Sequence, residues 1–241
     1  MTLSLQRLRE TGDSFKSRIH YGANWLARYE SALDEEDVNL KIVEGQLIEE
    51  VLRERGLWGQ LEYYLDIGTC TGRYLLFLRG AVKKGGTIIG IDDNPECIQF
   101  AKSNIQKTCP EDARISIHRK NFAAVELVLP LTRFHLITCM MSTISHFGQD
   151  RNDGFDDLLQ TALRRMADYL DENGVLIFSA WSQHACNSGN FLSIYQQQDR
   201  QRLAEWTPSE AELRMRLKNA GFTTVQMSRP SIRLNLWVCQ C

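Results

Sequence analysis

The chain has 241 residues, 43% of them hydrophobic and 24% charged, which suits one sizeable globular core. Its formal net charge of -2 lacks the basic excess that drives nucleic-acid binding, so the composition disfavours a nucleic-acid partner. No apolar stretch approaches the roughly 18 residues of a membrane span, and the N-terminus is too polar for a signal peptide, so we expect a cytoplasmic protein without a membrane partner. The seven cysteines have no CxxC spacing, so neither a metal site nor a disulfide framework is predicted.

Helices alternate with short apolar strands through the first half of the chain. Residues 38–55 carry apolar side chains at helical spacing. The apolar run at 63–67 ends in a turn punctuated by glycine, and the run at 87–91 ends just before Asn94 and Pro95, which can cap a helix. In chain order we expect a helix at 38–55, a strand at 63–67, a helix at 74–82, a strand at 87–91 and a helix from Pro95 to about Thr108.

The second half continues this alternation and ends in two strands. A helix is predicted from Asn152 to the terminating residues 171–174, and the last helix is predicted to start in a capping box at 207–210 and to end at Gly221. Residues 182–206 are polar and irregular, and a segment of this length is typical of a lid or binding segment. The remaining strands are expected around Ile115 and Ile117, at 134–140, at 175–181, at 222–228 and at 231–240.

This order of elements predicts the fold class. Strands that alternate with helices from 63 to 181 are typical of a parallel sheet with helices on both faces. The last two strands have almost no chain between them, so they can pair only antiparallel. We therefore predict an α/β fold, a doubly wound, seven-stranded, mostly parallel sheet whose last strand is antiparallel. Residues 38–241 would form this domain, and residues 1–37 a helical extension that covers it.

Polar residues and glycines gather where the predicted strands end. Asp66, Gly68 and Gly72 follow the first strand, and Asp92 follows the second. Ligands of doubly wound sheets bind at the carboxyl ends of the strands, where glycine lets the backbone approach the ligand. A carboxylate two residues before Gly68 would repel a pyrophosphate, so the motif disfavours a dinucleotide such as NAD. It suits a cationic ligand, with Asp92 placed to accept hydrogen bonds from ribose hydroxyls.

These stretches make the chain resemble the class I methyltransferases that use S-adenosylmethionine (SAM), over roughly residues 38–241. The resemblance rests on Leu65-Asp66-Ile67-Gly68-Thr69-Cys70-Thr71-Gly72-Arg73, on Gly90-Ile91-Asp92-Asp93-Asn94-Pro95, on the strand from Phe134 to Met140, and on Asn173-Gly174-Val175-Leu176. It implies a Rossmann-like sheet with strand order 3-2-1-4-5-7-6. It also implies SAM as the cofactor and S-adenosylhomocysteine (SAH) as the product.

The resemblance assigns roles to individual residues around the cofactor. Gly68 and Gly72 would form the backbone floor under SAM, beside Thr69. Asp66 would hold the methionine amino group, Asp92 the ribose with Asp93 next to it, Asn121 and Phe122 the adenine, and the Cys139 backbone the amino-acid end. Two positions depart from the family pattern. Cys70 replaces the middle glycine of the turn, and Asn121 stands where an aspartate is common, although its oxygen can still accept a hydrogen bond.

Two looser likenesses concern the substrate. The segment from Cys139 to Phe147 is similar to the loop where substrate meets methyl donor, and His146 in it is a candidate general base or substrate orienter. Residues 20–29 are similar to an N-terminal cover, where Tyr21 is a candidate to shield the methyl acceptor. Trp25 and Tyr29 share a helix face with Tyr21, a pattern that is more often simple packing. His184, at the start of the predicted lid, is a weaker candidate base.

The predicted function is transfer of a methyl group from SAM to an N or O nucleophile of a small molecule, such as a natural product. Within the same enzyme class, methylation of RNA or of a protein side chain stays open. Two other classes also stay open: a SAM-binding regulator without catalysis, which Cys70 and Asn121 keep possible, and an NAD-dependent oxidoreductase. The sequence specifies neither the acceptor nor the oligomeric state.

Overall fold

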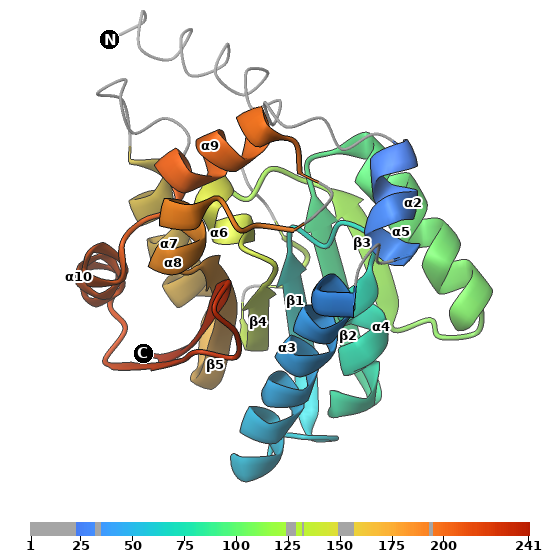
Figure 1. The fold of residues 1–241 in the computed structure, drawn as a ribbon. Coiled ribbons are helices and arrows are strands. Elements are labelled where there is room, and N and C mark those ends of the chain that lie inside the picture. Colours follow the sequence, from blue (N-terminus) through green and yellow to red (C-terminus); the bar gives the residue numbers. More distant parts are fainter. Residues whose placement is uncertain (1–22, 32–34, 124–128, 132, 149–156, 193–194) are drawn as a thin grey trace, which may run out of the picture.

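The computed structural model describes residues 23–31, 35–123, 129–131, 133–148, 157–192 and 195–241, and these contain a seven-stranded sheet of order β3-β2-β1-β4-β5-β7-β6 (Figure 1). Neighbouring strands from β3 through β5 are parallel, whereas β7 pairs antiparallel with both β5 and β6. The predicted fold class and strand order are confirmed. The strands are β1 (Leu61–Ile67), β2 (Val82–Asp92), β3 (Ile115–Arg119), β4 (Phe134–Cys139), β5 (Leu170–Trp181), β6 (Thr224–Ser228) and β7 (Leu234–Gln240).

Helices cover both faces of the sheet because its central strands are apolar on both sides. On one face, Tyr64 and Ile88 pack with residues of α3 and α4. On the other face, Leu65 and Phe178 pack with residues of α7 and α10. The helices are α2 (Ala23–Ser31), α3 (Glu35–Glu54), α4 (Arg73–Leu78), α5 (Pro95–Thr108), α6 (Thr143–His146), α7 (Leu158–Tyr169), α8 (Gln183–Ser188), α9 (Gln197–Trp206) and α10 (Glu210–Ala220), with a short 3-10 turn, η1 (Arg79–Ala81), after α4.

Local capping explains where two helices begin. Asn94 accepts a hydrogen bond from the Glu96 N–H, with Pro95 as the first helical residue, as predicted. The start of α10 differs from the prediction: its N-cap is Ser209, which accepts from the Glu212 N–H, so Pro208 precedes the helix. The C-terminal end agrees with the prediction, because Gly221 closes α10 in a left-handed conformation.

Several predicted boundaries are wrong. Residues 171–174 terminate no helix, since α7 ends at Tyr169 and they lie within β5. Residues 182–206 are not irregular, because they contain α8 and α9; α9 is mostly polar and buries Leu203 and Trp206, which gives a weak helical pattern. The helix predicted at 38–55 starts earlier, because α3 begins at Glu35. The predicted helix start at Asn152 lies outside the described residues.

A third group of buried side chains joins α2, α8, α9 and the end of β5. It includes Tyr29, Trp181, Tyr195 and Trp206. In Figure 1, α2 and α9 lie at the edge of the sheet where the parallel strands end. This group therefore covers the edge at which ligands of doubly wound sheets bind. None of the described helices is long and apolar enough to cross a membrane.

Candidate active site

An open cavity of about 1080 Å³ lies at the carboxyl ends of β1, β2 and β4. It is lined by the turn after β1 and by Asp92, Asp93, Asn121 and Phe122. The lining also includes the aromatic residues Trp25, Tyr29 and Tyr195, together with Met140, Met141 and His146. The cavity thus brings together residues from the predicted cofactor site and from the two predicted substrate segments.

The turn after β1 has a strained backbone that is held by hydrogen bonds. The N–H groups of Gly68 and Thr69 both donate to the Ile91 carbonyl at 2.9 Å. Gly68 and Cys70 have φ values of 70° and 47°, in the left-handed region that favours glycine. A Cβ on Gly68 would lie 2.4 Å from Thr143 Cγ2, so only glycine fits between the turn and α6. Gly72, by contrast, does not line the cavity but packs against Ala101 of α5.

Asp92 links this turn to the start of α5. Its Oδ2 accepts from the Cys70 N–H and its Oδ1 from the Asn94 N–H, each at 2.9 Å. Asp92 lines the cavity, and burial raises the pKa of its carboxyl to about 7. Burial also raises the pKa of the adjacent Asp93, which lines the cavity as well. The two carboxylates are thus placed to accept hydrogen bonds from a ligand with neighbouring hydroxyl groups.

Asp66 lies beneath the turn and does not line the cavity. Its Oδ1 accepts from Thr138 Oγ1 at 2.6 Å, and Oδ2 is buried with no hydrogen-bond partner of ordinary geometry in the described chain. Burial raises the pKa of Asp66 to about 6, and the Thr138 and Thr69 hydroxyls oppose this rise. The Thr69 hydroxyl is also buried without such a partner. Cys139 is fully buried and likewise lies outside the cavity lining, which its neighbour Met140 reaches.

Asn121 and Phe122 line the cavity next to Asp92, as predicted for an adenine site. The Asn121 side-chain oxygen accepts from the Ala123 N–H at 2.9 Å, which fixes the orientation of the amide. This oxygen keeps a second lone pair for a ligand. Phe122 lies 6.4 Å from the ring of Phe147, and the two rings form an apolar wall there.

The aromatic side of the cavity comes from two distant segments. Trp25 stacks on Tyr29 with ring centroids 5.1 Å apart, and Tyr195 lies 5.8 Å from Trp25. The face predicted to be simple packing therefore also lines the cavity. Tyr195 was missed because residues 182–206 carry no pattern that singles it out. Tyr21 lies outside the described residues, so its predicted role remains a prediction.

His146 lines the cavity in α6, and the loop that carries it is firmly anchored. Met141 and Ser142 have φ values of 49° and 60°, and the Ser145 hydroxyl hydrogen-bonds to those of Ser142 and Thr207. Burial lowers the pKa of His146 to about 4, so its imidazole is neutral at physiological pH and is a weak base. Of its two predicted roles, orientation of a substrate suits this environment better than proton removal. His184 lines a separate hollow.

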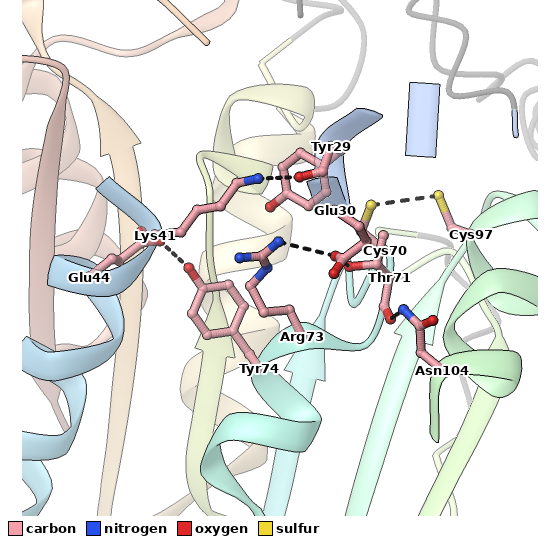
Figure 2. Close-up of polar contacts among 10 residues, drawn as sticks. All are labelled: Tyr29, Glu30, Lys41, Glu44, Cys70, Thr71, Arg73, Tyr74, Cys97 and Asn104. Carbon is pink, nitrogen blue, oxygen red and sulfur yellow. Dashed lines mark hydrogen bonds and ion pairs between the residues drawn. The ribbon is translucent and has the colours of Figure 1, made fainter. Parts of the chain in front are cut away.

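Charged side chains from the N-terminal helices meet the turn, as Figure 2 shows. Arg73 lines the cavity, forms an ion pair with Glu30 at 3.2 Å and lies over the ring of Tyr29. Glu30 also accepts a hydrogen bond from the Thr71 hydroxyl, and Lys41 donates to the Tyr29 carbonyl. Burial and the charge of Arg73 lower the pKa of Lys41 to about 8. These contacts join residues far apart in the sequence, so no local pattern predicted them.

The raised pKa of Asp92 predicts a pH-dependent stability. Its folded pKa of about 7 exceeds the value near 3.9 of an unfolded chain, so the folded state holds more protons between these values. The free energy of unfolding should therefore fall as the pH rises from 4 to 7, by up to about 4 kcal/mol for this group. Urea unfolding of the wild type and of Asp92→Asn measures this change in the free energy of unfolding. As the pH rises from 4 to 7, the variant should gain stability relative to the wild type. A difference independent of pH would contradict the raised pKa.

No three His, Cys, Asp or Glu side chains gather as metal ligands would in the described part of the chain. Among curated proteins, none matches this chain. Solved structures share its fold, at sequence identities that establish the fold alone. A SAM-dependent methyltransferase from Aquifex aeolicus has 18% identity and a TM-score of 0.62, with 89% of this chain and 97% of that chain covered.

Two further structures have more specific names. Magnesium protoporphyrin IX methyltransferase from Synechocystis PCC 6803, solved with bound SAH, has 16% identity and a TM-score of 0.62, with 92% of this chain and 96% of that chain covered. The N-methyltransferase NodS from Bradyrhizobium japonicum has 16% identity and a TM-score of 0.58, with 86% and 98% covered.

The family comparison goes beyond the fold, because a model described as a methyltransferase domain matches residues 40–227. That range includes the turn after β1, Asp92, Asn121 and His146. The protein therefore belongs to the methyltransferase-domain family and is a methyltransferase with SAM as its cofactor.

Proposed function

We propose that this methyltransferase binds SAM along the turn after β1 and transfers the methyl group to an N or O nucleophile of a small molecule. The observation that carries the proposal is the lining of the cavity. It combines the Gly68–Thr71 turn and Asp92 with the aromatic residues Trp25, Tyr29 and Tyr195. A donor and an acceptor can therefore occupy the same cavity.

The residues of the cavity fit SAM chemically. The glycine at position 68 leaves the turn without a Cβ, and Asp92 can accept from the ribose hydroxyls while Asn121 and Phe122 face the adenine. Arg73 would supply a cation for the methionine carboxylate, and the buried Asp66 carboxyl, which lies beneath the turn and outside the cavity lining, would provide negative charge for the amino group. Gly72 and Cys139 would contribute by fixing the packing under the turn.

SAM supplies a methyl group on a positively charged sulfur, which is already activated for displacement. The protein must therefore align the acceptor, exclude water and accommodate the acceptor's proton. Trp25 and Tyr195 would exclude water, and the neutral imidazole of His146 would orient the acceptor through hydrogen bonds. A neutral amine needs no strong base for this step, in keeping with the low pKa of His146.

A small acceptor suits the cavity better than RNA. The described cavity lining contains Arg73 and Lys120 as its Lys and Arg residues, and Arg73 is paired with Glu30. A basic rim that follows a phosphate backbone would need more cations than this. Two of the structural neighbours are named for a porphyrin substrate and for N-methylation, which agrees with a small-molecule acceptor. We also propose that residues 182–206, which bring Tyr195 to the cavity, act as a lid.

The proposal is tested by incubating the protein with SAM carrying a deuterated methyl group and a panel of small amines, phenols and carboxylic acids. Mass spectrometry should find the labelled methyl on a nitrogen or oxygen of a member of this panel. Label found only on RNA or on protein substrates offered in parallel would contradict the small-molecule assignment.

Tyr195→Leu should weaken the binding of the acceptor more than the binding of the cofactor. The change keeps an apolar side chain but loses ring contacts, and aromatic pairs contribute about 0.5–1.5 kcal/mol beyond their buried area. We expect the KM of the acceptor to rise roughly fivefold, while the Kd of SAM changes less than about twofold. Steady-state kinetics and calorimetry give the two values. A loss of SAM affinity as large as the loss of acceptor affinity would show that Tyr195 contacts the cofactor.

A further inference from the structure

Two cysteines meet inside the cofactor cavity. Cys70 follows Thr69 in the turn after β1, and Cys97 lies in the first turn of α5. Their sulfur atoms are 3.9 Å apart, and both residues line the cavity (Figure 2). Cys97 is buried, whereas Cys70 is partly exposed. All seven cysteines of the chain are free thiols. In the described structure, Cys70 and Cys97 are the only two whose sulfur atoms contact each other.

The turn carries Cys70 at a backbone position that suits glycine. Its φ of 47° is in the left-handed region, where a side chain costs roughly 1 kcal/mol or more. Its N–H donates to Asp92 Oδ2, so Cys70 also helps to hold the carboxylate placed at the ribose. A movement of Cys70 is therefore transmitted to both the turn and Asp92.

We propose that Cys70 and Cys97 form a redox-modification site, in which a disulfide between them weakens the binding of SAM. The inference rests on the proposed position of SAM over the turn. A disulfide has an S–S distance of about 2.05 Å, so the two sulfurs must approach each other by about 1.9 Å. We expect this approach to disturb the hydrogen bond from the Cys70 N–H to Asp92 Oδ2 and the part of the cavity wall that the two side chains form.

The oxidant is a low-molecular-weight disulfide such as glutathione disulfide. Cys70 loses its proton to solvent, and the thiolate attacks one sulfur of glutathione disulfide and releases one glutathione thiolate. Cys97 then loses its proton and attacks the Cys70 sulfur, which releases the second glutathione thiolate. The two released thiolates take up the two protons, so the cysteine pair is oxidised by two electrons and one glutathione disulfide is reduced to two glutathione molecules.

The environment favours this order of reaction. The pKa of the Cys97 thiol is strongly raised, first by its hydrogen bond to Cys70, then by burial and by the charges of Asp92 and Asp93. Cys70 is the more exposed of the two thiols, so an oxidant from solvent reaches it first. Cys97 then lies next to the Cys70 sulfur of the mixed disulfide and is placed to attack it.

The coupling between oxidation and SAM binding must be reciprocal. If the disulfide weakens SAM binding tenfold, saturating SAM makes the pair tenfold harder to oxidise. For a two-electron couple, this factor raises the reduction potential by about 30 mV. Bound SAM should thus protect the pair, and the reduction potential of the pair can be measured in glutathione buffers with and without SAM.

The experiment compares reduced protein with protein treated with glutathione disulfide, in a Cys241→Ser background that removes the exposed thiol. Peptide mapping should find a Cys70–Cys97 cross-link, and the Kd of SAH should rise at least tenfold and recover on reduction. Cys70→Ser is the matched control: it removes the thiol that attacks the oxidant, so no cross-link forms and its Kd should be the same with and without oxidant. Mixed disulfides without the cross-link would overturn the proposal, as would a cross-linked protein whose Kd changes less than twofold.

The same series separates this inference from the proposed function. Cross-linking is read by mass and needs no bound ligand. If the reduced wild type failed to bind SAH, the proposed position of SAM would be wrong, and this inference with it. If the reduced protein binds SAH and the oxidised protein binds it equally well, only the inference on the cysteine pair is overturned.

Discussion

Asp92→Ala should raise the Kd of SAM at least 100-fold. Asp92 is placed to accept two ribose hydroxyls, and hydrogen bonds to a charged group contribute about 1.5–3 kcal/mol each. Its loss also removes the acceptor of the Cys70 and Asn94 N–H groups, which loosens the turn under the cofactor. Asp92→Asn keeps one acceptor oxygen, so it should raise the Kd of SAM less than Asp92→Ala does. Isothermal titration calorimetry at pH 8, above the raised pKa of Asp92, measures these differences.

Asp171→Asn is the matched control for this prediction. Asp171 lies near the amino end of β5, away from the cavity, and the substitution removes one carboxylate in the same way. Its Kd for SAM should equal that of the wild type. An alanine variant at position 92 that is folded by circular dichroism and binds SAM within threefold of the wild type would show that Asp92 does not hold the ribose.

Gly68→Ala should be the most destabilising single-methyl change in the turn. The new Cβ would meet Thr143 Cγ2 at 2.4 Å and Oγ1 at 2.7 Å, and φ is 70°. Left-handed backbone costs about 1–2 kcal/mol for a residue with a Cβ, and overpacking adds roughly 1–3 kcal/mol. We expect a loss of about 2–5 kcal/mol in the free energy of unfolding, measured by urea titration.

Gly56→Ala separates the two costs. Gly56 has a similar φ of 66° but nothing within 4 Å of an added Cβ, so the substitution should cost only the backbone part. Thr143→Ala combined with Gly68→Ala should recover part of the stability that overpacking removes. A double-mutant cycle reports this recovery as a coupling energy. If Gly68→Ala cost no more than Gly56→Ala, the close contact between the turn and α6 would be wrong.

Much of the fold was predictable because it depends on local and periodic features. The apolar runs that become β1 and β2, the Asn94 cap and Gly221 all act within a few residues of themselves. Strand pairing at the C-terminus was predictable because so short a connection allows only the antiparallel arrangement. Asp92 and Asn121, which the sequence places at strand ends, line one cavity because strand ends meet at one edge of a parallel sheet; their role toward the cofactor stays a prediction.

What could not be predicted depends on contacts between distant residues. The buried ion pair of Arg233 with Asp37 joins the residue just before β7 to α3 across 196 positions, and no spacing rule connects the two. Tyr195 reaches the cavity because its own ring packs against Trp181 and Trp25. It lies in a polar segment whose helices have a weak sequence pattern. The low pKa of His146 follows from burial, which the sequence does not state.

A crystal structure of the reduced protein with SAH tests the central claim most directly. The account predicts that the SAH ribose hydroxyls contact Asp92, that the methionine end lies over the Gly68–Thr71 turn, and that the sulfur faces the space between Tyr29, Tyr195 and His146. SAH bound elsewhere, or bound with its sulfur turned away from the aromatic side, would contradict the account.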